Sequence, residues 1–142
     1  TDYSAGPYFD HVKVVGAVSY EKIFPHCRAV VHHGGSGTTA AALRAGVPSL
    51  ILWMAGDQPF WGAQLKRLKV GTARKFITTT PESLLSDLRQ ICTPDYIARA
   101  RTLGARMIPR AESVSRAADL LEEFAKVEGG RADKLRRSNR SI

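Results

Sequence analysis

The sequence predicts an α/β domain with a parallel sheet and flanking helices, and two observations support this. Short strand-like runs alternate along the chain with longer segments that carry apolar residues at helical spacing. The run Ser49–Trp53 is apolar almost throughout, which is typical of a parallel strand covered on both faces.

In chain order, residues 1–10 form a predicted loop, because they contain a Gly-Pro pair and no periodic pattern. The β-branched run 12–15, bounded by Gly16, predicts a short strand. Residues 19–24 favour one helical turn, which Pro25 is expected to end.

The next two predicted strands each lead into a loop and a helix. The apolar run 29–31 is followed by a glycine-rich loop and a helix from about Gly37 to Ala45, which Gly46 closes. The strand 49–53 is followed by a loop at 55–59 and a helix that Gly71 is expected to close. The apolar face of that helix consists of Trp61, Leu65 and Leu68.

The remaining chain predicts an edge strand and three helices. The strand spans 70–75, and Thr80 before Pro81 is the usual start of a helix, an N-cap followed by proline in the first position. Two further helices are expected near 95–108 and 111–127.

Composition places the chain among globular proteins. Its 142 residues are enough for one domain with a core, and 44% of them are hydrophobic. No apolar run reaches the roughly 18 residues that span a bilayer. Cys27 and Cys92 lack the spacing of a metal site or a disulfide framework, so we interpret them as core thiols of a reducing compartment, the cytoplasm.

Half of the net charge of +8 lies in the last dozen residues, which carry Arg131, Asp133, Lys134, Arg136, Arg137 and Arg140. No aromatic residues lie between them, so a nucleic-acid partner is not expected. We divide the chain into a domain at 1–128 and a basic tail at 129–142 that is expected to be disordered. Weak contact of this tail with an anionic membrane surface, and hence a peripheral location, is the alternative.

The clearest chemical signal is the loop after the second strand, where three of four residues are Gly34, Gly35 and Gly37. A strand, a glycine loop and a helix start present unpaired N–H groups and the positive end of a helix dipole, which attract phosphate. The pattern is neither the dinucleotide fingerprint nor a Walker A loop, because no lysine follows the last glycine. A flexible turn is the alternative.

Asp57 and Gln58 follow the next strand, and the carboxyl ends of adjacent parallel strands meet at one edge of a sheet. A carboxylate accepts hydrogen bonds from sugar hydroxyls, and an amide both donates and accepts them. Phosphate capture beside hydroxyl recognition predicts a sugar phosphate or nucleotide sugar, with a helix-start acid as the alternative for Asp57. His32 and His33 predict no metal site, because neighbours in an extended chain point opposite ways.

The run from Val30 to Lys66, VVHHGGSGTTAAALRAGVPSLILWMAGDQPFWGAQLK, resembles the donor-binding signature of UDP-sugar-dependent glycosyltransferases of the GT-B fold. The similarity is to the sterol, lipid and macrolide glycosyltransferases, which carry HHGG-x-GT and GDQ-x-x-(W/N) segments, and it covers about 12–127. It implies the carboxyl-terminal of two Rossmann-like domains in an inverting, metal-independent enzyme. No cofactor is implied, and the co-substrate is a nucleotide sugar, UDP-glucose in the first instance.

The resemblance also implies a role for individual residues. The donor diphosphate is held by His32, Gly34, Gly35, Ser36, Gly37 and Thr38. The transferred sugar is held by Asp57 and Gln58. Ala17 and Ala40 stand where plant members carry a uracil-stacking Trp and a ribose-reading Glu. Backbone groups near Val18 are therefore expected to bind the base, and the choice between UDP and TDP stays open.

Family members further contain an amino-terminal domain that binds the acceptor and supplies a histidine base. We therefore expect no catalytic residue in this chain and no activity from the chain alone. The run 12–15 aligns with the third strand of a sheet ordered 3-2-1-4-5-6, so the first two strands would come from a partner chain or from upstream sequence. The expected function is donor binding for hexose transfer to a lipid, sterol or other hydrophobic hydroxyl. A non-catalytic nucleotide-binding or partner-interaction module is the alternative.

Overall fold

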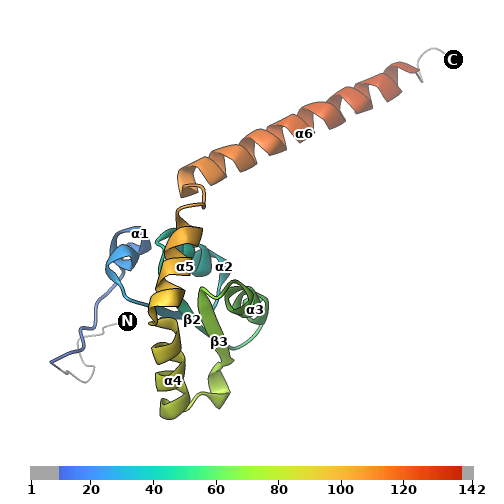
Figure 1. Cartoon of the computed structure of the whole chain (residues 1–142). Helices are drawn as coiled ribbons and strands as arrows, with labels where there is room; N and C mark the ends of the chain where they lie inside the picture. The colour runs from blue at the N-terminus through green and yellow to red at the C-terminus, as the bar shows by residue number, and fades with distance from the viewer. Residues whose placement is uncertain (1–9, 139–142) are drawn as a thin grey trace. The chain divides into compact units, whose positions relative to one another are not determined.

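The computed structural model describes residues 10–138, with side chains as far as Val127. Its centre is a parallel sheet of three strands in the order β1-β2-β3 (Figure 1). The strands are β1 (Val30–His32), β2 (Ser49–Trp53) and β3 (Gly71–Lys75). Val30 pairs with Ser49 and Ser49 with Gly71, so the three strands begin level. The predicted α/β class with a parallel sheet and flanking helices is confirmed.

Helices connect the strands close to the predicted positions. The described chain up to Met107 belongs to a first compact unit, whose longer helices are α2 (Ser36–Arg44), α3 (Gln58–Leu68), α4 (Pro81–Ile91) and α5 (Pro94–Gly104). The short ones are α1 (Tyr20–Ile23) and two 3₁₀ turns, η1 (Phe24–His26) and η2 (Phe76–Thr78). Thr80 caps α4 as expected, because its side chain accepts from the Ser83 N–H while the Ser83 hydroxyl accepts from the Thr80 N–H.

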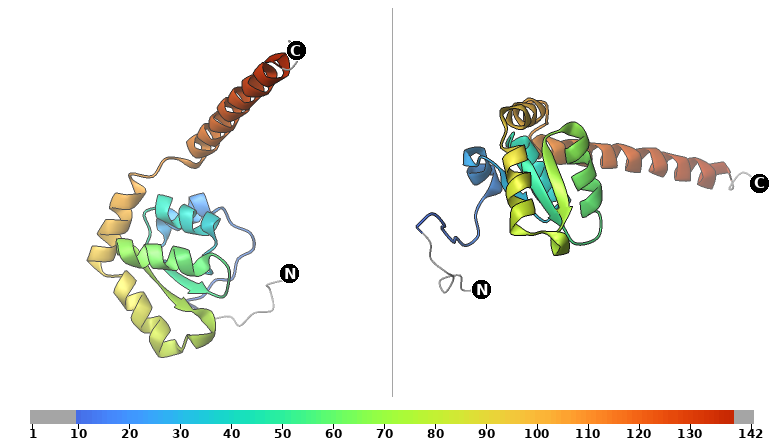
Figure 2. Two further views of the ribbon diagram at one scale, coloured as in Figure 1. Left: turned by 90° about the vertical axis from the view of Figure 1, so that its right-hand side faces the viewer. Right: turned by 60° about the horizontal axis from the view of Figure 1, so that its bottom comes forward.

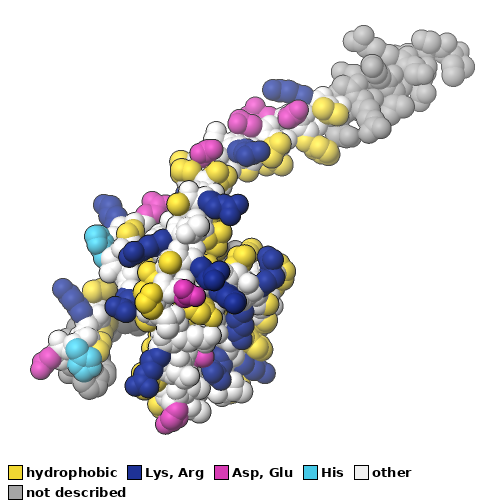
Figure 3. All heavy atoms as spheres, in the orientation of Figure 1, with side chains coloured by type: hydrophobic (Ala, Val, Ile, Leu, Met, Phe, Trp, Pro, Cys, Tyr) yellow, Lys and Arg dark blue, Asp and Glu magenta, His cyan; other side chains and the backbone are white. Residues whose placement is uncertain are grey.

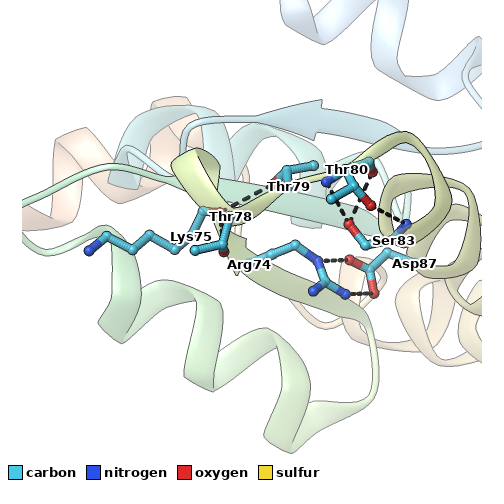
Figure 4. A network of polar contacts seen from close by, with 7 residues as sticks. All are labelled: Arg74, Lys75, Thr78, Thr79, Thr80, Ser83 and Asp87. Carbon is cyan, nitrogen blue, oxygen red and sulfur yellow. Dashed lines mark hydrogen bonds and ion pairs between the residues drawn. The ribbon is translucent and has the colours of Figure 1, made fainter.

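Helices α3 and α4 cover opposite faces of the sheet (Figure 2). Ala73 of β3 faces Gly62 of α3, and a Cβ added to Gly62 would lie 2.5 Å from the Cβ of Ala73. The next residue, Arg74, faces α4 and pairs with Asp87, with 2.8 Å between Nε and Oδ2 (Figure 4). Successive side chains of β3 point to opposite faces of the sheet, so Ala73 packs against α3 and Arg74 pairs with α4.

The core of the first unit consists of two buried clusters. One contains Ile51, Leu65, Val70, Ala73 and Ala100, with Trp53 and Trp61 packed against it. The other contains Phe24, Val30, Ala42 and Val47. On the face drawn in Figure 3, Lys and Arg side chains of the first unit are scattered among hydrophobic ones.

The predicted strand at 12–15 is wrong. Val12 makes a single bridge, and residues 13–15 have no regular structure. Val12, Val14 and Val15 are each 46% exposed. A β-branched run becomes a strand only where another strand satisfies its N–H and C=O groups, and the described residues place none beside this run. Most of the predicted loop at 1–10 lies outside the described residues.

Three predicted helix ends also differ. Pro25 lies inside η1 instead of ending the turn. Helix α3 ends at Leu68, and its C-cap is Lys69, which adopts the left-handed conformation with φ 53°; Gly71 instead begins β3. Helix α5 ends at Gly104, where an added Cβ would lie 2.7 Å from the Leu43 carbonyl oxygen. The last of these ends depends on a contact with a distant residue, which local patterns do not contain.

Helix α6 (Arg110–Ser138) makes up most of a second compact unit, residues 108–142. It is longer than the predicted helix at 111–127. The predicted tail at 129–142 falls partly within this helix and partly outside the described residues, so its disorder and the boundary at 128 stay predictions. Across residues 10–138, no helix has both the length and the apolar character needed to cross a bilayer.

Candidate functional site

The glycine loop leaves the end of β1 and turns back over β2. Gly34 is buried and has φ +98°, a conformation that side chains rarely adopt. A Cβ at this position would lie 2.6 Å from Ile51 Cγ2 and 3.3 Å from Gln58 Cβ. Glycine therefore permits a close approach that brings the loop after β1 against the first residue of α3. The structure thus unites the predicted phosphate loop with the predicted sugar pair.

The start of α2 leaves its first N–H groups uncapped. Gly35 occupies the N-cap position and has no side chain to accept from Ser36, Gly37 or Thr38. The following Thr39 is buried, and its N–H and hydroxyl both bond the Gly35 carbonyl, at 3.0 and 2.9 Å. The N–H groups of Ser36, Gly37 and Thr38 lie at the positive end of the helix dipole, which is the arrangement expected of the predicted anion site.

Gly37 adds space at that helix start. It is exposed, and a Cβ added to it would meet no atom within 4 Å. The protein's own packing therefore does not require glycine here, in contrast to Gly34. Space for an anion at this helix start would explain the glycine, and that role stays a prediction.

His32, the last residue of β1, has a defined tautomer. Its Nδ1 accepts a hydrogen bond from the Gly34 N–H at 3.1 Å, so the proton of the neutral ring resides on Nε2. Burial, and secondarily the neighbouring His33, lower the pKa of His32 from 6.5 to about 4. Nε2 is buried and has no hydrogen-bond partner in the described part of the chain. The ring is thus a neutral donor that a phosphate oxygen would satisfy.

Gln58 uses its amide oxygen within the protein. Oε1 accepts from the backbone N–H groups of Met54 and Ala55, at 2.8 and 3.2 Å. In this structure the oxygen is committed to the loop after β2, and the role of the amide toward a sugar stays a prediction. What Gln58 offers a ligand is the NH₂ group, a donor.

Asp57 offers the complementary acceptor. It is exposed at the N-cap of α3, and its Oδ2 accepts from the Trp61 indole N–H at 2.8 Å. Asp57 and Gln58 therefore present one acceptor and one donor beside the predicted phosphate loop. The sequence analysis did not predict the hydrogen bond from Trp61 to Asp57, although a spacing of four residues places both on one side of a helix.

Two further predictions concern the base-binding residue Val18 and the absence of a metal site. Val18 is 41% exposed in the irregular segment before α1, and its role in base binding stays a prediction. Among the side chains that the structure describes, residues 10–127, no group of three His, Cys, Asp or Glu residues is placed to hold a metal ion.

A family model described as erythromycin biosynthesis protein CIII-like, C-terminal domain, matches residues 4–127. An uncharacterized glycosyltransferase of Mycobacterium bovis is 59% identical over 126 residues, which cover 89% of this chain and 30% of the relative. The O-mycaminosyltylonolide 6-deoxyallosyltransferase of Streptomyces fradiae is 40% identical over 78% of this chain and 26% of its own length. A sterol 3-beta-glucosyltransferase of Cryptococcus neoformans is 34% identical over 84% of the chain but 8% of its own length.

Solved structures show the same likeness. The kitacinnamycin glycotransferase superposes with a TM-score of 0.72 and 27% identity, over 85% of this chain and 32% of that chain. Glycosyltransferase VinC, in complex with dTDP, gives a TM-score of 0.68 and 28% identity over 83% and 31%. The chain thus spans about a third or less of the proteins that it matches. Because the family model covers most of its residues, the chain belongs to the erythromycin biosynthesis protein CIII-like C-terminal domain family, and its fold is that of the carboxyl-terminal part of GT-B glycosyltransferases.

Proposed function

We propose that this chain forms the donor-binding part of an inverting, metal-independent glycosyltransferase that moves a hexose from a nucleotide sugar to a hydroxyl group. The observation that supports this proposal is the close approach of Gly34 to Gln58, because it brings the predicted anion site and the predicted hydroxyl-binding pair together at one edge of the sheet. A nucleotide sugar carries its diphosphate next to a sugar with several hydroxyl groups, so one such ligand could bind both groups of residues. Membership of a family whose relatives include glycosyltransferases supports the same interpretation.

The proposed chemistry follows from the donors at the helix start. Glycosyl transfer breaks the bond between the anomeric carbon and a phosphate oxygen, and negative charge develops on the departing nucleoside diphosphate. The N–H groups of Ser36–Thr38 and the neutral Nε2–H of His32 would stabilise that charge. Asp57 would accept from a sugar hydroxyl, and the Gln58 NH₂ would donate to one. The acceptor site and the base that deprotonates the acceptor would lie outside this chain, so the chain alone would not transfer sugar.

For the donor, we propose UDP-glucose first and a dTDP-sugar as its competitor. The structure of glycosyltransferase VinC is a complex with dTDP, which supports a nucleoside diphosphate as the ligand of this fold. For the acceptor, we propose a hydrophobic hydroxyl compound, either a lipid or sterol or a macrolide. The deoxyallosyltransferase and sterol glucosyltransferase relatives support these classes.

Calorimetric titration of the chain with UDP, dTDP and UDP-glucose tests the proposal. We expect a nucleotide to bind, UDP-glucose to bind more tightly than UDP, and Asp57→Ala to remove that difference while leaving UDP binding intact. Asp95→Ala is the matched control, because Asp95 is an exposed acid at the start of α5. Equal affinity of the unaltered chain for UDP and UDP-glucose would count against Asp57 and Gln58 as the sugar-binding pair.

One observation favours a second candidate, a partner-interaction module. β1 is an edge strand of the sheet, and its Val31 is 46% exposed. An open edge of this kind can accept a strand from another chain. Mass measurement under native conditions separates the candidates: a complex with an amino-terminal partner favours a two-part enzyme, and a self-dimer favours the module.

A further inference from the structure

We infer that Trp61 is a positioning residue for the donor sugar: its indole N–H fixes the Asp57 carboxylate so that Oδ1 faces ligand as the acceptor. This inference rests on the proposed function, and it gives Trp61, the tryptophan of the GDQ-x-x-(W/N) segment, a role that the resemblance did not assign. Three features of the structure support it. Asp57 occupies an N-cap position without capping the helix, the Trp61 ring packs against the core, and the neighbouring Gln58 side chain is also held by the protein.

Asp57 occupies the N-cap position of α3 but does not do what aspartate usually does there. A capping carboxylate accepts from the N–H of the second or third helical residue. In this structure the Asp57 side chain makes no such bond, and its backbone has φ −82° and ψ −5° rather than the extended values of most N-caps. Oδ2 instead accepts from the Trp61 indole at 2.8 Å. The carboxylate is thus held away from the helix start that it could stabilise.

Trp61 is a firm anchor for this bond. Its ring is half-buried and packs against the cluster that contains Ile51 and Leu65. Phe60 contacts the ring edge to face, with centroids 5.3 Å apart. Asp57 itself is exposed, so without the indole its side chain would be free to sample several rotamers. The bond ties an exposed acceptor to the core.

The neighbouring Gln58 is held in a comparable way. Its Oε1 is fixed by two backbone N–H groups of the loop after β2. Both members of the sugar pair therefore spend one oxygen on the protein and keep one group for a ligand: Oδ1 of Asp57 and the NH₂ of Gln58. A preset acceptor and donor lose less conformational entropy when they bind a sugar than freely rotating ones.

The test compares dissociation constants of the chain for UDP and UDP-glucose, and for dTDP and dTDP-glucose. Trp61→Phe keeps an aromatic ring but removes the N–H. The preference for the sugar is the dissociation constant for the nucleotide divided by that for the nucleotide sugar. We expect Trp61→Phe to reduce this ratio by roughly threefold while leaving the affinity for UDP or dTDP alone unchanged. Trp53→Phe is the matched control, because Trp53 also packs against the core, whereas the indole that bonds Asp57 belongs to Trp61.

A double-mutant cycle separates positioning from packing. If Trp61 acts through Asp57, Trp61→Phe has no further effect on the ratio in an Asp57→Ala background. If Trp61 only packs, Trp61→Phe weakens nucleotide and nucleotide-sugar binding together, and the inference is overturned. The chain's two tryptophans give two indole N–H signals in NMR spectra, and Asp57→Ala should shift only that of Trp61.

The failure of this inference differs from that of the proposed function. An unaltered chain that shows no preference for the nucleotide sugar contradicts the proposed function, and the inference with it. A preference that Asp57→Ala abolishes but Trp61→Phe leaves at full strength contradicts the inference alone.

Discussion

The backbone N–H of Gly34 donates a hydrogen bond to Nδ1 of His32 at 3.1 Å. This bond makes the histidine a donor through Nε2, and it also fixes the first turn of the glycine loop. The two residues therefore act together: the loop sets the tautomer, and the tautomer suits the ring for a phosphate oxygen.

His32 should make the stability of the protein depend on pH. Its pKa is about 4 in the folded chain, against an ordinary value of 6.5, because burial and His33 disfavour its charge. As pH falls from 7 to 4, the unfolded chain binds a proton that the folded chain does not, so stability decreases. After allowance for partial exposure, we expect a loss of roughly 1–2 kcal/mol. Urea unfolding across this range measures it, and in His32→Gln this part of the slope should vanish.

Gly34→Ala should destabilise the chain, because the new Cβ would lie 2.6 Å from Ile51 Cγ2 in a backbone with φ +98°. We expect a loss of roughly 2–4 kcal/mol, seen as a lower midpoint of thermal unfolding. Gly37→Ala is the control, since its Cβ would meet nothing within 4 Å. That variant should keep its stability but bind UDP or dTDP several-fold more weakly. Equal stability losses in the two variants would contradict the distinction.

Gln58→Glu should separate loop anchoring from sugar binding. The new carboxylate keeps an oxygen that accepts from the Met54 and Ala55 N–H groups, but it loses the NH₂ donor. We expect a change in unfolding free energy below about 0.5 kcal/mol and a lower affinity for UDP-glucose, with UDP binding reduced less. Gln58→Ala, which loses both functions, should also lower the thermal midpoint. A Gln58→Glu variant with unaltered sugar preference would mean that the NH₂ group does not bind sugar.

Thr80→Ala should weaken the start of α4, because it removes the acceptor for the Ser83 N–H (Figure 4). Loss of such a cap costs about 1 kcal/mol, measurable by denaturant unfolding. Nucleotide binding should not change, since the affected helix start lies on a different element from the glycine loop. Ser83→Ala, which removes the other half of the reciprocal pair, should give a smaller loss.

Local patterns predicted most of the fold because the forces behind them act within a few residues. Thr80 and Pro81 mark a helix start in any surroundings, since a side-chain oxygen and a fixed φ stabilise the first turn directly. The strand at 49–53 was predicted with the right bounds, because continuous burial requires continuous apolar side chains. The same locality explains the failure at 12–15, where the described residues place no strand beside a strand-like run.

The sequence by itself determined the residue types of the candidate site: three glycines before a helix, a histidine at the end of a strand, and an Asp-Gln pair one strand later. Only the tertiary structure decided how they are used. Gly34 is glycine because two side chains from β2 and α3 approach it, whereas Gly37 is glycine beside open space. The side-chain oxygen of Gln58 already accepts from the Met54 and Ala55 N–H groups, and one carboxylate oxygen of Asp57 accepts from Trp61. Such assignments depend on distances between groups that folding brings together, and residue spacing along the chain does not contain them.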